Sequence, residues 1–557
     1  MLRNLPWLVW IFLRLMYWIL WGSRPRQLER NFGPKDKKKF MSAWQAANLI
    51  ERGYVVIVAG LGANGWVPAP FKAAAKMFQK FGYPGELTVI APAGQGGRGL
   101  RSGSIDDWAK YPGLLIRLFS GHLETFRHTL CAAAKGRIEV QCIPQGAFCR
   151  LIKEMAEGGN SFSTKAGVGT FADPRVGVGT CIANASRQWV EVVGDSLKYT
   201  CPMPNVAIIC ATAADEFGNV YLDDVTLLGD IFSAIFATKR NGGKVIMQVG
   251  KIIPKKSGQY IKADLIDAIV VRPDTPQTLC FTQRRPFKAL IQGAQYDVQR
   301  ALAMIAFLNR LAGLTPKRGP LDLKIARAAA LVLTGHIKAG AVGNIGVGLP
   351  EQVAAALACG GVMSQLKTML ESGPIGGVAA SGALFGTAIN PVDLMEACEV
   401  FRLIEKDGLD SAVLGALQVG FNGDVNLSRR GPNIEDVVGP GGATHITYGA
   451  KVLMFVMRLR ERPRQGEKLG RLRFVEQLHE VTFSAAEALK AGKKVFYATD
   501  CGVFQLTPDG LTLIRRLPDF SIGQIRELLP FVQVSDKVRV FGQNVVDGEI
   551  FSLVLDH

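Results

Sequence analysis

The sequence has no closely spaced pair of cysteines, and this absence excludes several kinds of protein. Its ten cysteines lie at positions 131, 142, 149, 181, 201, 210, 280, 359, 398 and 501, and no two of them form a CxxC pair. Neither a zinc site nor a redox-active pair is indicated, and a disulfide scaffold is not expected in a chain of 557 residues. We therefore expect reduced thiols in an intracellular protein, and no bound metal.

The chain also lacks the composition of a disordered or fibrous protein. Hydrophobic residues make up 48% of it and charged residues 20%, as in globular proteins. Its 62 glycines follow no fixed period, so they indicate turns and close backbone approaches. A length of 557 residues is too great for one ordinary hydrophobic core and predicts two or more domains.

No basic module with interleaved aromatic residues accompanies the formal charge of +18. Part of the excess is local, since residues 1–40 hold nine lysines and arginines against Glu29 and Asp36, a balance of +7. A nucleic-acid-binding protein would concentrate its charge in one such module, so nucleic acid is not expected as a partner. The charge suits anionic lipid or a phosphorylated small molecule.

The first hydrophobic run, at 5–22, lacks the small-residue cleavage site that follows a secretory signal. On a helix its aromatic residues and Arg14 would share one stripe, which suits the headgroup region of a bilayer. Residues 1–41 are predicted to be a hydrophobic and basic leader that associates with a membrane surface; the alternative is a helix packed on the body or on another subunit. The basic stretch at 24–39 favours a cytoplasmic location, at the inner face of the membrane.

Beyond the leader, apolar runs alternate with helical patterns. The run at 54–60 predicts a strand, residues 69–81 predict a helix, and the run at 87–92 predicts a second strand. Strands separated by helices are typical of parallel βαβ units, so the sequence predicts the α/β fold class.

An internal repeat accompanies this alternation. AANLIERGYVVIVAGLGANGWVP at 46–68 resembles AAALVLTGHIKAGAVGNIGVGLP at 328–350, at a constant offset of 282 residues. A second match follows each loop: Asn219 and Lys244 correspond to Asn426 and Lys451, and the two members of each pair are 25 positions apart. The repeat predicts two similar α/β domains with mainly parallel sheets, preceded by the hydrophobic helix. The boundaries predicted are a leader at 1–41, a first domain at 42–314, a linker at 315–322 and a second domain at 323–557.

The first glycine-rich loop, from Gly60 to Gly65, satisfies GxGxxG between a strand and a helix, as in dinucleotide-binding folds. That pattern also needs an acidic residue at the end of the next strand, whereas Glu86 stands at its beginning. A dinucleotide-dependent oxidoreductase is therefore disfavoured, although the bare backbone of the loop suits an anion or the polar arm of a cofactor.

A lone carboxylate marks the second half. LESGPIGGVAASG at 370–382 places Glu371 between a helix-like stretch and a glycine-rich run, where a solvated residue at a helix end is the ordinary interpretation. The segment and the preceding loop GNIGVGLPE at 343–351 resemble the ESGxIGG and NxGxGxPE motifs of family I coenzyme A (CoA) transferases, which include propionate and acetate/3-ketoacid CoA-transferases. Further stretches that resemble the family, over residues 42–535, are PAGQGGRGL (92–100), GHLETF (121–126), IPQGAF (143–148), GVGTFADPR (167–175), ADEFGNV (214–220), GDVNLSRRGP (423–432), GPGGATHI (439–446) and VFYATDCGVFQLTPDGL (495–511).

The resemblance implies an active site between two α/β domains and a ping-pong transfer of CoA from an acyl-CoA to a free carboxylic acid. Glu371 would attack the thioester and then carry a glutamyl-CoA thioester. Oxyanion donors are implied at Gln95 and at the backbone of Gly442. The positions implied to steady the loop, line the CoA arm or leave room for the substrate are Asn344, Gly346, Gly348, Gly376 and Gly377. CoA is implied as a substrate, with no permanently bound cofactor, and a homo-oligomer is expected.

Two other functions stay open at this point. An acyl-CoA hydrolase would use the same glutamate with water as the acceptor, and a non-catalytic, membrane-associated acyl-CoA-binding protein would keep only the fold. Ala379 and residues 499–501 depart from the family pattern near the expected acyl pocket, so the resemblance does not give the acyl group. His122 and His336 have no partner carboxylate spaced with them and are predicted to be structural.

Overall fold

The computed structural model describes residues 35, 38–62, 64–97, 103–258, 260–273, 287–311, 318–463, 466–548 and 552–555. The predicted leader helix at 5–22 lies outside these residues. No helix of the described part is long and apolar enough to cross a membrane. The nine cysteines that it includes are free thiols.

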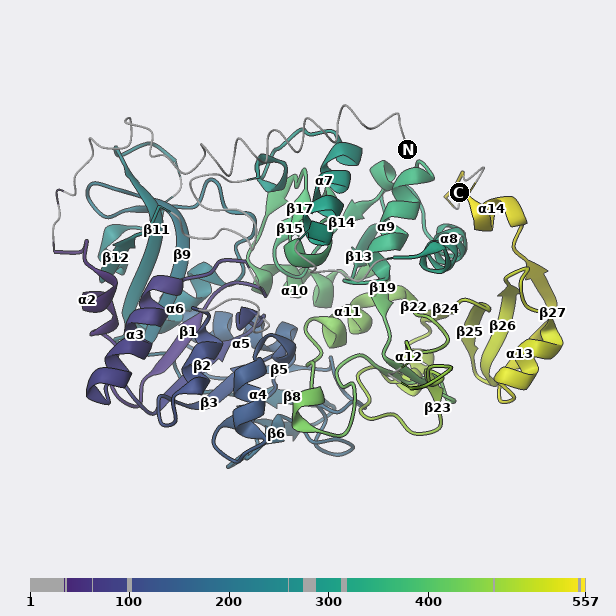
Figure 1. Ribbon diagram of the computed structural model, residues 1–557, viewed down its shortest axis with the longest axis horizontal. Helices are drawn as coiled ribbons and strands as arrows, with labels where there is room; N and C mark the ends of the chain where they lie inside the picture. Colours follow the sequence, from purple (N-terminus) through teal and green to yellow (C-terminus); the bar gives the residue numbers. More distant parts are fainter. Residues whose placement is uncertain are drawn as a thin grey trace.

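The first half of the chain, drawn in purple to blue-green in Figure 1, is built on one mainly parallel sheet. All of its neighbouring strands pair in parallel except β6, which is antiparallel to β4, and β10, which is antiparallel to β9. The strands, in spatial order, are β12 (Ala268–Val271), β11 (Lys244–Ile253), β9 (Val206–Asp215), β1 (Val55–Val58), β2 (Leu87–Ala91), β3 (Leu115–Ser120), β4 (Glu139–Gln141) and β6 (Cys181–Ala183), with β10 (Val220–Tyr221) beside β9. The predicted strands at 54–60 and 87–92 are confirmed as β1 and β2.

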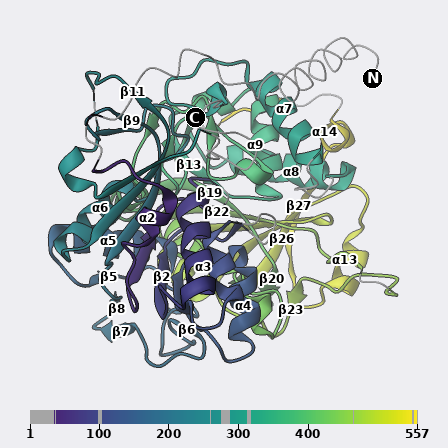
Figure 2. The ribbon, with the colours of Figure 1, turned by 60° about the vertical axis from the view of Figure 1, so that its left-hand side comes forward.

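Helices cover both faces of this sheet, so its central strands are buried along their whole length and consist mainly of valine, isoleucine, leucine and alanine. Figure 2 shows two of these helices, α2 and α3, in front of the strands that they cover. The helix predicted at 69–81 is confirmed as α3, which begins with Pro68 in the first turn and ends at Gly82 with a left-handed φ of 68°. The helices of this half are α2 (Ala43–Ala47), α3 (Pro68–Phe81), α4 (Arg127–Ala133), α5 (Gln145–Glu157) and α6 (Ile231–Arg240), with 3-10 turns η4 (Ile105–Lys110), η5 (Leu123–Thr125) and η6 (Ala263–Leu265).

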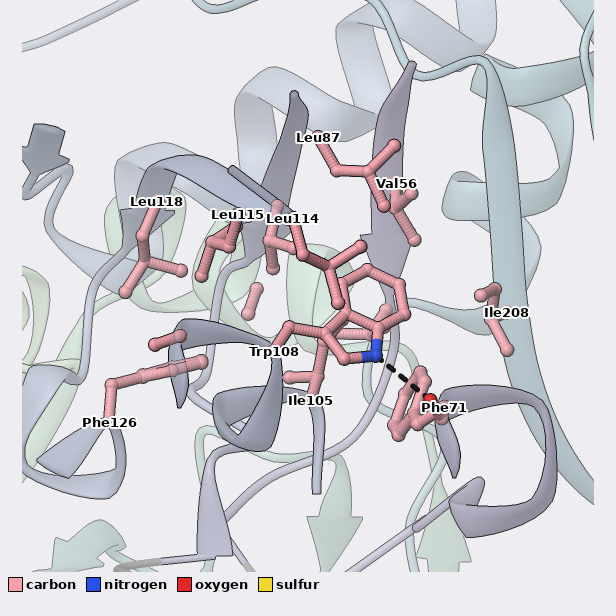
Figure 3. Packing of buried hydrophobic residues seen from close by; sticks show 14 of the residues in the cluster. Val56, Phe71, Leu87, Ile105, Trp108, Leu114, Leu115, Leu118, Phe126 and Ile208 are labelled. Atoms are coloured by element: carbon pink, nitrogen blue, oxygen red, sulfur yellow. Dashed lines mark hydrogen bonds between the residues drawn. The ribbon is translucent and has the colours of Figure 1, made fainter. Parts of the chain in front are cut away.

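The indole ring of Trp108 packs in the hydrophobic core under α3. Trp108, in η4, is fully buried, and its Nε1 donates a hydrogen bond to the backbone oxygen of Phe71, 3.0 Å away (Figure 3). The Phe71 and Trp108 rings meet edge to face with centroids 5.8 Å apart. This contact fixes α3 over the sheet, and α3 in turn fixes the loop that leads into it.

The second half carries a second sheet. It is parallel from β14 to β24, whereas β25 is antiparallel to both of its neighbours and β27 is parallel to β26. In spatial order its strands are β14 (Lys367–Thr368), β13 (Val342–Ile345), β19 (Leu409–Gly415), β22 (Ala450–Val456), β24 (Lys494–Ala498), β25 (Gly502–Thr507), β26 (Gly510–Arg516) and β27 (Gln533–Val540). The helices are α7 (Val298–Leu311), α8 (Pro320–Thr334), α9 (Pro350–Cys359), α10 (Ala397–Lys406), α11 (Ala443–Gly449), α12 (Ala485–Lys490), α13 (Ile522–Leu528) and α14 (Gln543–Asp547).

Smaller elements join and decorate the two sheets. They are the strand pairs β15 (Pro374–Ile375) with β18 (Asp393–Leu394) and β16 (Val378–Ala379) with β17 (Ala388–Ile389), and the three-stranded sheets β5 (Phe162–Thr164), β8 (Ser196–Tyr199), β7 (Val190–Val193) and β21 (Val425–Asn426), β20 (Gln418–Gly420), β23 (Phe474–Val475). The short 3-10 turns are η7 (Lys288–Leu290), η8 (Met363–Gln365), η9 (Gly382–Leu384) and η10 (Ile434–Asp436).

The strand order repeats between the halves, since β2-β1-β9-β11 in the first sheet corresponds to β14-β13-β19-β22 in the second. Pro68 and Pro350 also occupy the same place, at the start of α3 and of α9. The constant offset of 282 residues nevertheless fails for the strands, because it pairs β1 with residues 337–340, which form no strand. Residues 59–67 separate β1 from α3, whereas only 346–349 separate β13 from α9, so the first loop is longer. The domain boundaries given above stay a prediction.

Candidate active site

Glu371 lies in a tight turn at the carboxyl end of a short strand. The N–H of Gly373 donates to the oxygen of Leu370 at 3.0 Å, and the N–H of Leu370 donates to the oxygen of Pro374 at 2.9 Å. The helix suggested before Glu371 is wrong, because this stretch forms the single 3-10 turn η8 and then β14. Strand β14 lies beside β13, so the turn stands next to the second glycine loop, at the edge where parallel sheets present ligand-binding residues.

The surroundings of Glu371 favour its neutral form. Burial raises the pKa of its carboxyl above the ordinary value, and hydrogen bonds from its own backbone and from Asn344 oppose this effect only in part. The Nδ2 of Asn344 lies 3.4 Å from Oε2 of Glu371 and 2.8 Å from the oxygen of Met369. Asn344 is itself 1% exposed, and no group of the described residues bonds to its Oδ1. The pair therefore offers a poorly solvated carboxylate and a free amide oxygen.

Both residues face a cleft of about 670 Å³ between the two halves. The first half contributes Leu61, His122, Glu124 and Gln145. The second half contributes the glycine loop of 346–349, the segment 438–443 and several arginines. Apolar side chains that also line the cleft are Phe385, Leu414, Leu417, Leu427, Ile446, Val456 and Met457.

Five of the eight residues predicted for the site line this cleft. They are Glu371, Asn344, Gly346, Gly348 and Gly442. The structure thus brings together the carboxylate, the amide beside it, the glycine loop and the backbone of the 439–442 segment. The roles assigned to these residues remain predictions.

Gln95 lies elsewhere. It is 1% exposed, and its Nε2 donates to the backbone oxygens of Ala59, at 3.3 Å, and of Gly65. An added Cβ on Gly60 would lie 2.3 Å from that nitrogen, so the amide fills the inside of the first glycine loop. Gln95 therefore braces the loop and does not line the cleft, which leaves the predicted oxyanion role without geometric support.

Gly376 and Gly377 also lie outside the cleft lining. Both have left-handed φ angles, 74° and 75°. The N–H of Gly376 donates to the oxygen of Thr368 at 2.7 Å, and a Cβ on Gly377 would lie 2.2 Å from the oxygen of Ile389. These glycines let the chain fold back closely against the backbone at Thr368 and Ile389. This packing supports the turn that carries Glu371.

The sequence analysis missed Gln145. It is 1% exposed, lines the cleft, and has no hydrogen-bond partner for its Oε1 or Nε2 among the described residues. It is the first residue of α5, and its N–H donates to the oxygen of Gly441 at 2.9 Å, so it lies beside Gly442. No described backbone oxygen accepts the N–H of Gly442. The sequence feature that could have indicated Gln145 is its place in IPQGAF, directly after a proline, where a parallel strand is followed by a helix.

Within the described ranges, no group of three or more histidines, cysteines, aspartates or glutamates is placed to hold a metal ion. The rings of His122 and Phe385 lie 6.1 Å apart at the edge of the cleft, and His336 stacks on Phe496 at 4.8 Å, away from it. The polar groups that line the cleft are carboxylates, amides, backbone N–H groups, arginines and the ring of His122.

Comparison with known proteins gives this site a class. The family of the malonate decarboxylase alpha subunit, transporter, matches residues 187–306. Two curated proteins match nearly end to end: caffeate CoA-transferase of Acetobacterium woodii is 28% identical, over 87% of this chain and 92% of its own, and acetate CoA-transferase YdiF of Escherichia coli K12 is 28% identical, over 86% and 90%.

A solved structure agrees with these relatives. The acyl-CoA transferase YdiF of E. coli O157:H7, solved as a thioester complex with CoA, superposes with a TM-score of 0.79 at 25% identity and covers 94% of this chain and 100% of its own. The resemblance predicted from the sequence is thereby confirmed: the chain is a relative of the family I CoA-transferases. It is an enzyme of the CoA-transferase type.

Proposed function

We propose that the enzyme transfers CoA from an acyl-CoA to a free carboxylic acid through a glutamyl-CoA thioester on Glu371. The observation that carries the proposal is the placement of Glu371, a poorly solvated carboxylate in a turn that opens on the cleft between the halves. Asn344 touches this carboxylate, and the glycine loop beside it leaves room for a thioester.

The reaction divides into balanced steps. The carboxylate of Glu371 attacks the carbonyl carbon of the acyl-CoA, and the thioester bond breaks to leave a mixed anhydride and CoA thiolate. The thiolate then attacks the carbonyl carbon of Glu371, and the original acyl group departs as a carboxylate. The second acid repeats these steps in reverse and leaves as a new acyl-CoA. Each attack requires an ionised nucleophile, and a carboxylate with few water molecules around it attacks more readily than a fully hydrated one.

Each tetrahedral intermediate places negative charge on a former carbonyl oxygen, which needs fixed donors. Gln145 and Gly442 meet that need better than Gln95 does. The Nε2 of Gln145 and the N–H of Gly442 have no partner among the described residues, and both residues line the same cleft as Glu371. We therefore assign the side-chain donor to Gln145 and retain Gly442 as the backbone donor.

Trapping tests the proposal. The protein is incubated with an acyl-CoA, reduced with borohydride, and digested for peptide mapping. The expected modification is an alcohol in place of the carboxyl of Glu371, because borohydride reduces a thioester and leaves a free carboxylate intact. A modification at another residue, or none while CoA exchange proceeds, would contradict the mechanism.

Two variants complete the experiment. Glu371→Gln keeps the size of the side chain and removes the nucleophile, so transfer should fall by at least about a thousandfold. Glu399→Gln changes a partly buried glutamate of α10 that pairs with Arg402 outside the cleft, and it should retain activity. Supplying a second carboxylic acid separates transfer, which yields a new acyl-CoA, from hydrolysis, which yields only free CoA.

A further inference from the structure

The cleft contains more positive charge than the transfer chemistry uses. Six arginines line it against three carboxylates, which are Glu124, Asp322 and Glu371. The arginines are Arg318, Arg430, Arg458, Arg460, Arg462 and Arg473.

Two of these arginines form ion pairs with carboxylates of the protein. Arg430 pairs with Glu124 across the two halves at 2.5 Å. Arg458 forms a two-pronged pair with Asp322, with distances of 2.7 and 2.8 Å. No described carboxylate lies within ion-pair distance of the other four, Arg318, Arg460, Arg462 and Arg473, which we name the arginine wall.

Much of the wall lies on a hairpin that follows β22. The N–H of Glu461 donates to the oxygen of Arg471 at 2.8 Å, and the N–H of Arg473 donates to the oxygen of Leu459 at 2.9 Å. Extended chain alternates its side chains, so Leu459 enters the core while Arg460 and Arg462 project to the opposite side. Successive arginines on that side are about 7 Å apart.

Arg473 has a buried donor that no described group of the protein uses. Burial lowers the pKa of its guanidinium; the charge of Glu461 opposes this effect, and the positive charge of Arg458 acts in the same direction as burial. Its Nη1 donates to the oxygens of Ala416, at 2.9 Å, and of Leu417, at 3.0 Å, but no described atom accepts from its buried Nε. A buried donor without an acceptor is unfavourable, and an anion in the cleft would supply the acceptor that this Nε lacks.

Arg318 connects the wall to the glycine loop. Its Nη2 lies 3.7 Å from the position that a Cβ on Gly348 would occupy, and nothing else lies within 4 Å of that position. The guanidinium therefore stands directly over the bare backbone of the loop. Positive charge thus runs from the loop, next to Glu371, to the hairpin.

We propose that the arginine wall binds the phosphate groups of the CoA nucleotide, its diphosphate and its 3′-phosphate. The inference rests on the proposed function, because it assigns the far end of the same substrate. Guanidinium groups bind phosphate through paired, charge-assisted hydrogen bonds. Arg460 donates only to the oxygen of Gly470 and Arg462 has no bond within the described ranges, so the protein leaves most of their donors available to a ligand.

The test compares two donors that share the reacting thioester. An acyl-CoA carries the phosphates, whereas the matching acyl-pantetheine lacks them. The double variant Arg460→Ala/Arg462→Ala should raise the KM for the acyl-CoA by about tenfold or more, leave kcat within twofold, and leave both constants for acyl-pantetheine unchanged. Arg471→Ala is the matched control, because Arg471 is exposed on the same hairpin and does not line the cleft.

A binding measurement separates this inference from the proposed function. Calorimetric titration with CoA, dephospho-CoA and pantetheine should give weaker binding of CoA to the double variant and equal binding of pantetheine to all proteins. A dephospho-CoA affinity that still falls in the variant assigns the wall to the diphosphate, and one that does not assigns it to the 3′-phosphate. Equal CoA affinity for the wild type and the variant would overturn the proposal, even if transfer itself fails in the wild type.

Discussion

At the scale of single residues, the surroundings of Glu371 shift the pKa of its carboxyl in opposite directions. Burial raises the pKa of its carboxyl, whereas the amide of Asn344 stabilises the ionised form. The nucleophile must be ionised, so activity should be present above the pKa of Glu371 and be lost as the pH falls through it. Because that pKa is raised, the loss should begin at a higher pH than for an exposed glutamate.

Replacing Asn344 tests this balance. In Asn344→Ala the carboxylate loses its one side-chain donor, so the acid limb of the kcat/KM profile should move to higher pH and the plateau should fall by about tenfold. The measurement is kcat/KM for an acyl-CoA across the pH range. Asn422→Ala, in an exposed turn of the same half, is the control. An unmoved acid limb would show that Asn344 does not act on the ionisation of Glu371.

Alanine variants of Gln145 and Gln95 should differ in what they lose: the first should lose activity and the second stability. Gln145→Ala removes an unpartnered amide from the cleft, so kcat should fall by about a hundredfold with little change in Tm. Gln95→Ala leaves the buried oxygens of Ala59 and Gly65 without this donor, so it should cost about 1–3 kcal/mol of stability and lower Tm. Steady-state kinetics and thermal denaturation distinguish them, and a reversed pattern would restore Gln95 to the oxyanion role.

The sequence could locate Glu371 because its motif is local, a few residues read in order. It could not choose between Gln95 and Gln145, since that choice depends on contacts between distant segments. Gln145 reaches the cleft through its bond to Gly441, nearly three hundred residues away, and Gln95 is turned inward by the loop that closes over it.

At the scale of elements, two helices from different halves cap one another. Glu396, before α10, accepts from the N–H groups of Phe232, at 2.7 Å, and Ser233, at 3.0 Å, at the start of α6. Asp230, before α6, accepts from the N–H of Cys398 at 3.3 Å, at the start of α10. The adjacent Gly229 donates to the oxygen of Ser372, so this junction also holds the turn that carries Glu371.

The junction should make stability depend on pH. Burial raises the pKa of Asp230 to about 7, with the charge of Glu396 acting in the same direction. The thiols of Cys149 and Cys398 and the hydroxyl of Ser233 are the other groups of this cluster, and burial also raises the pKa of Glu396. Asp230 is ionised above about pH 4 in the unfolded chain but keeps its proton to about 7 when folded, so its stabilising contribution is lost as the pH rises through this window.

Asp230→Asn keeps an acceptor for Cys398 and removes the titration. Its free energy of unfolding relative to the wild type should therefore increase from pH 5 to pH 7, by at most about 1.4 kcal/mol per pH unit. Thermal denaturation across this range gives the comparison, with Asp407→Asn, exposed at the end of α10, as the control. A constant difference between the two proteins would assign the junction a role that does not involve protonation.

Apolar runs and periodicity were sufficient to predict three elements of the first half. The strands β1 and β2 and the helix α3 follow from apolar runs and a helical pattern. The stretch before Glu371 was misread because η8 and β14 are too short to show a period. The capping between α6 and α10 has no sequence signature, since it joins residues more than 160 positions apart.

At the scale of the whole molecule, the repeat predicted two related halves, and the strand order confirms that they are built alike. What the repeat could not give is the cleft, because its walls come from loops of both halves that meet only after folding. Glu124 and Arg430 pair across it, and the arginine wall lines one part of it. An anionic substrate therefore meets both the net charge of +18 and the local positive charge of the arginine wall.

The effect of ionic strength on KM should show whether this positive charge attracts the substrate. Acyl-CoA is a polyanion, so a positive molecule with a positive cleft should attract it over a distance set by the Debye length, about 30 Å at 0.01 M salt and about 8 Å at 0.15 M. Raising the salt from about 0.02 to about 0.2 M should increase the KM for an acyl-CoA by about tenfold and that for acyl-pantetheine by less than about twofold. Arg460→Ala/Arg462→Ala should keep part of this dependence, because the rest of the charge remains. Equal factors for both donors would show that the charge of the molecule does not guide its substrate.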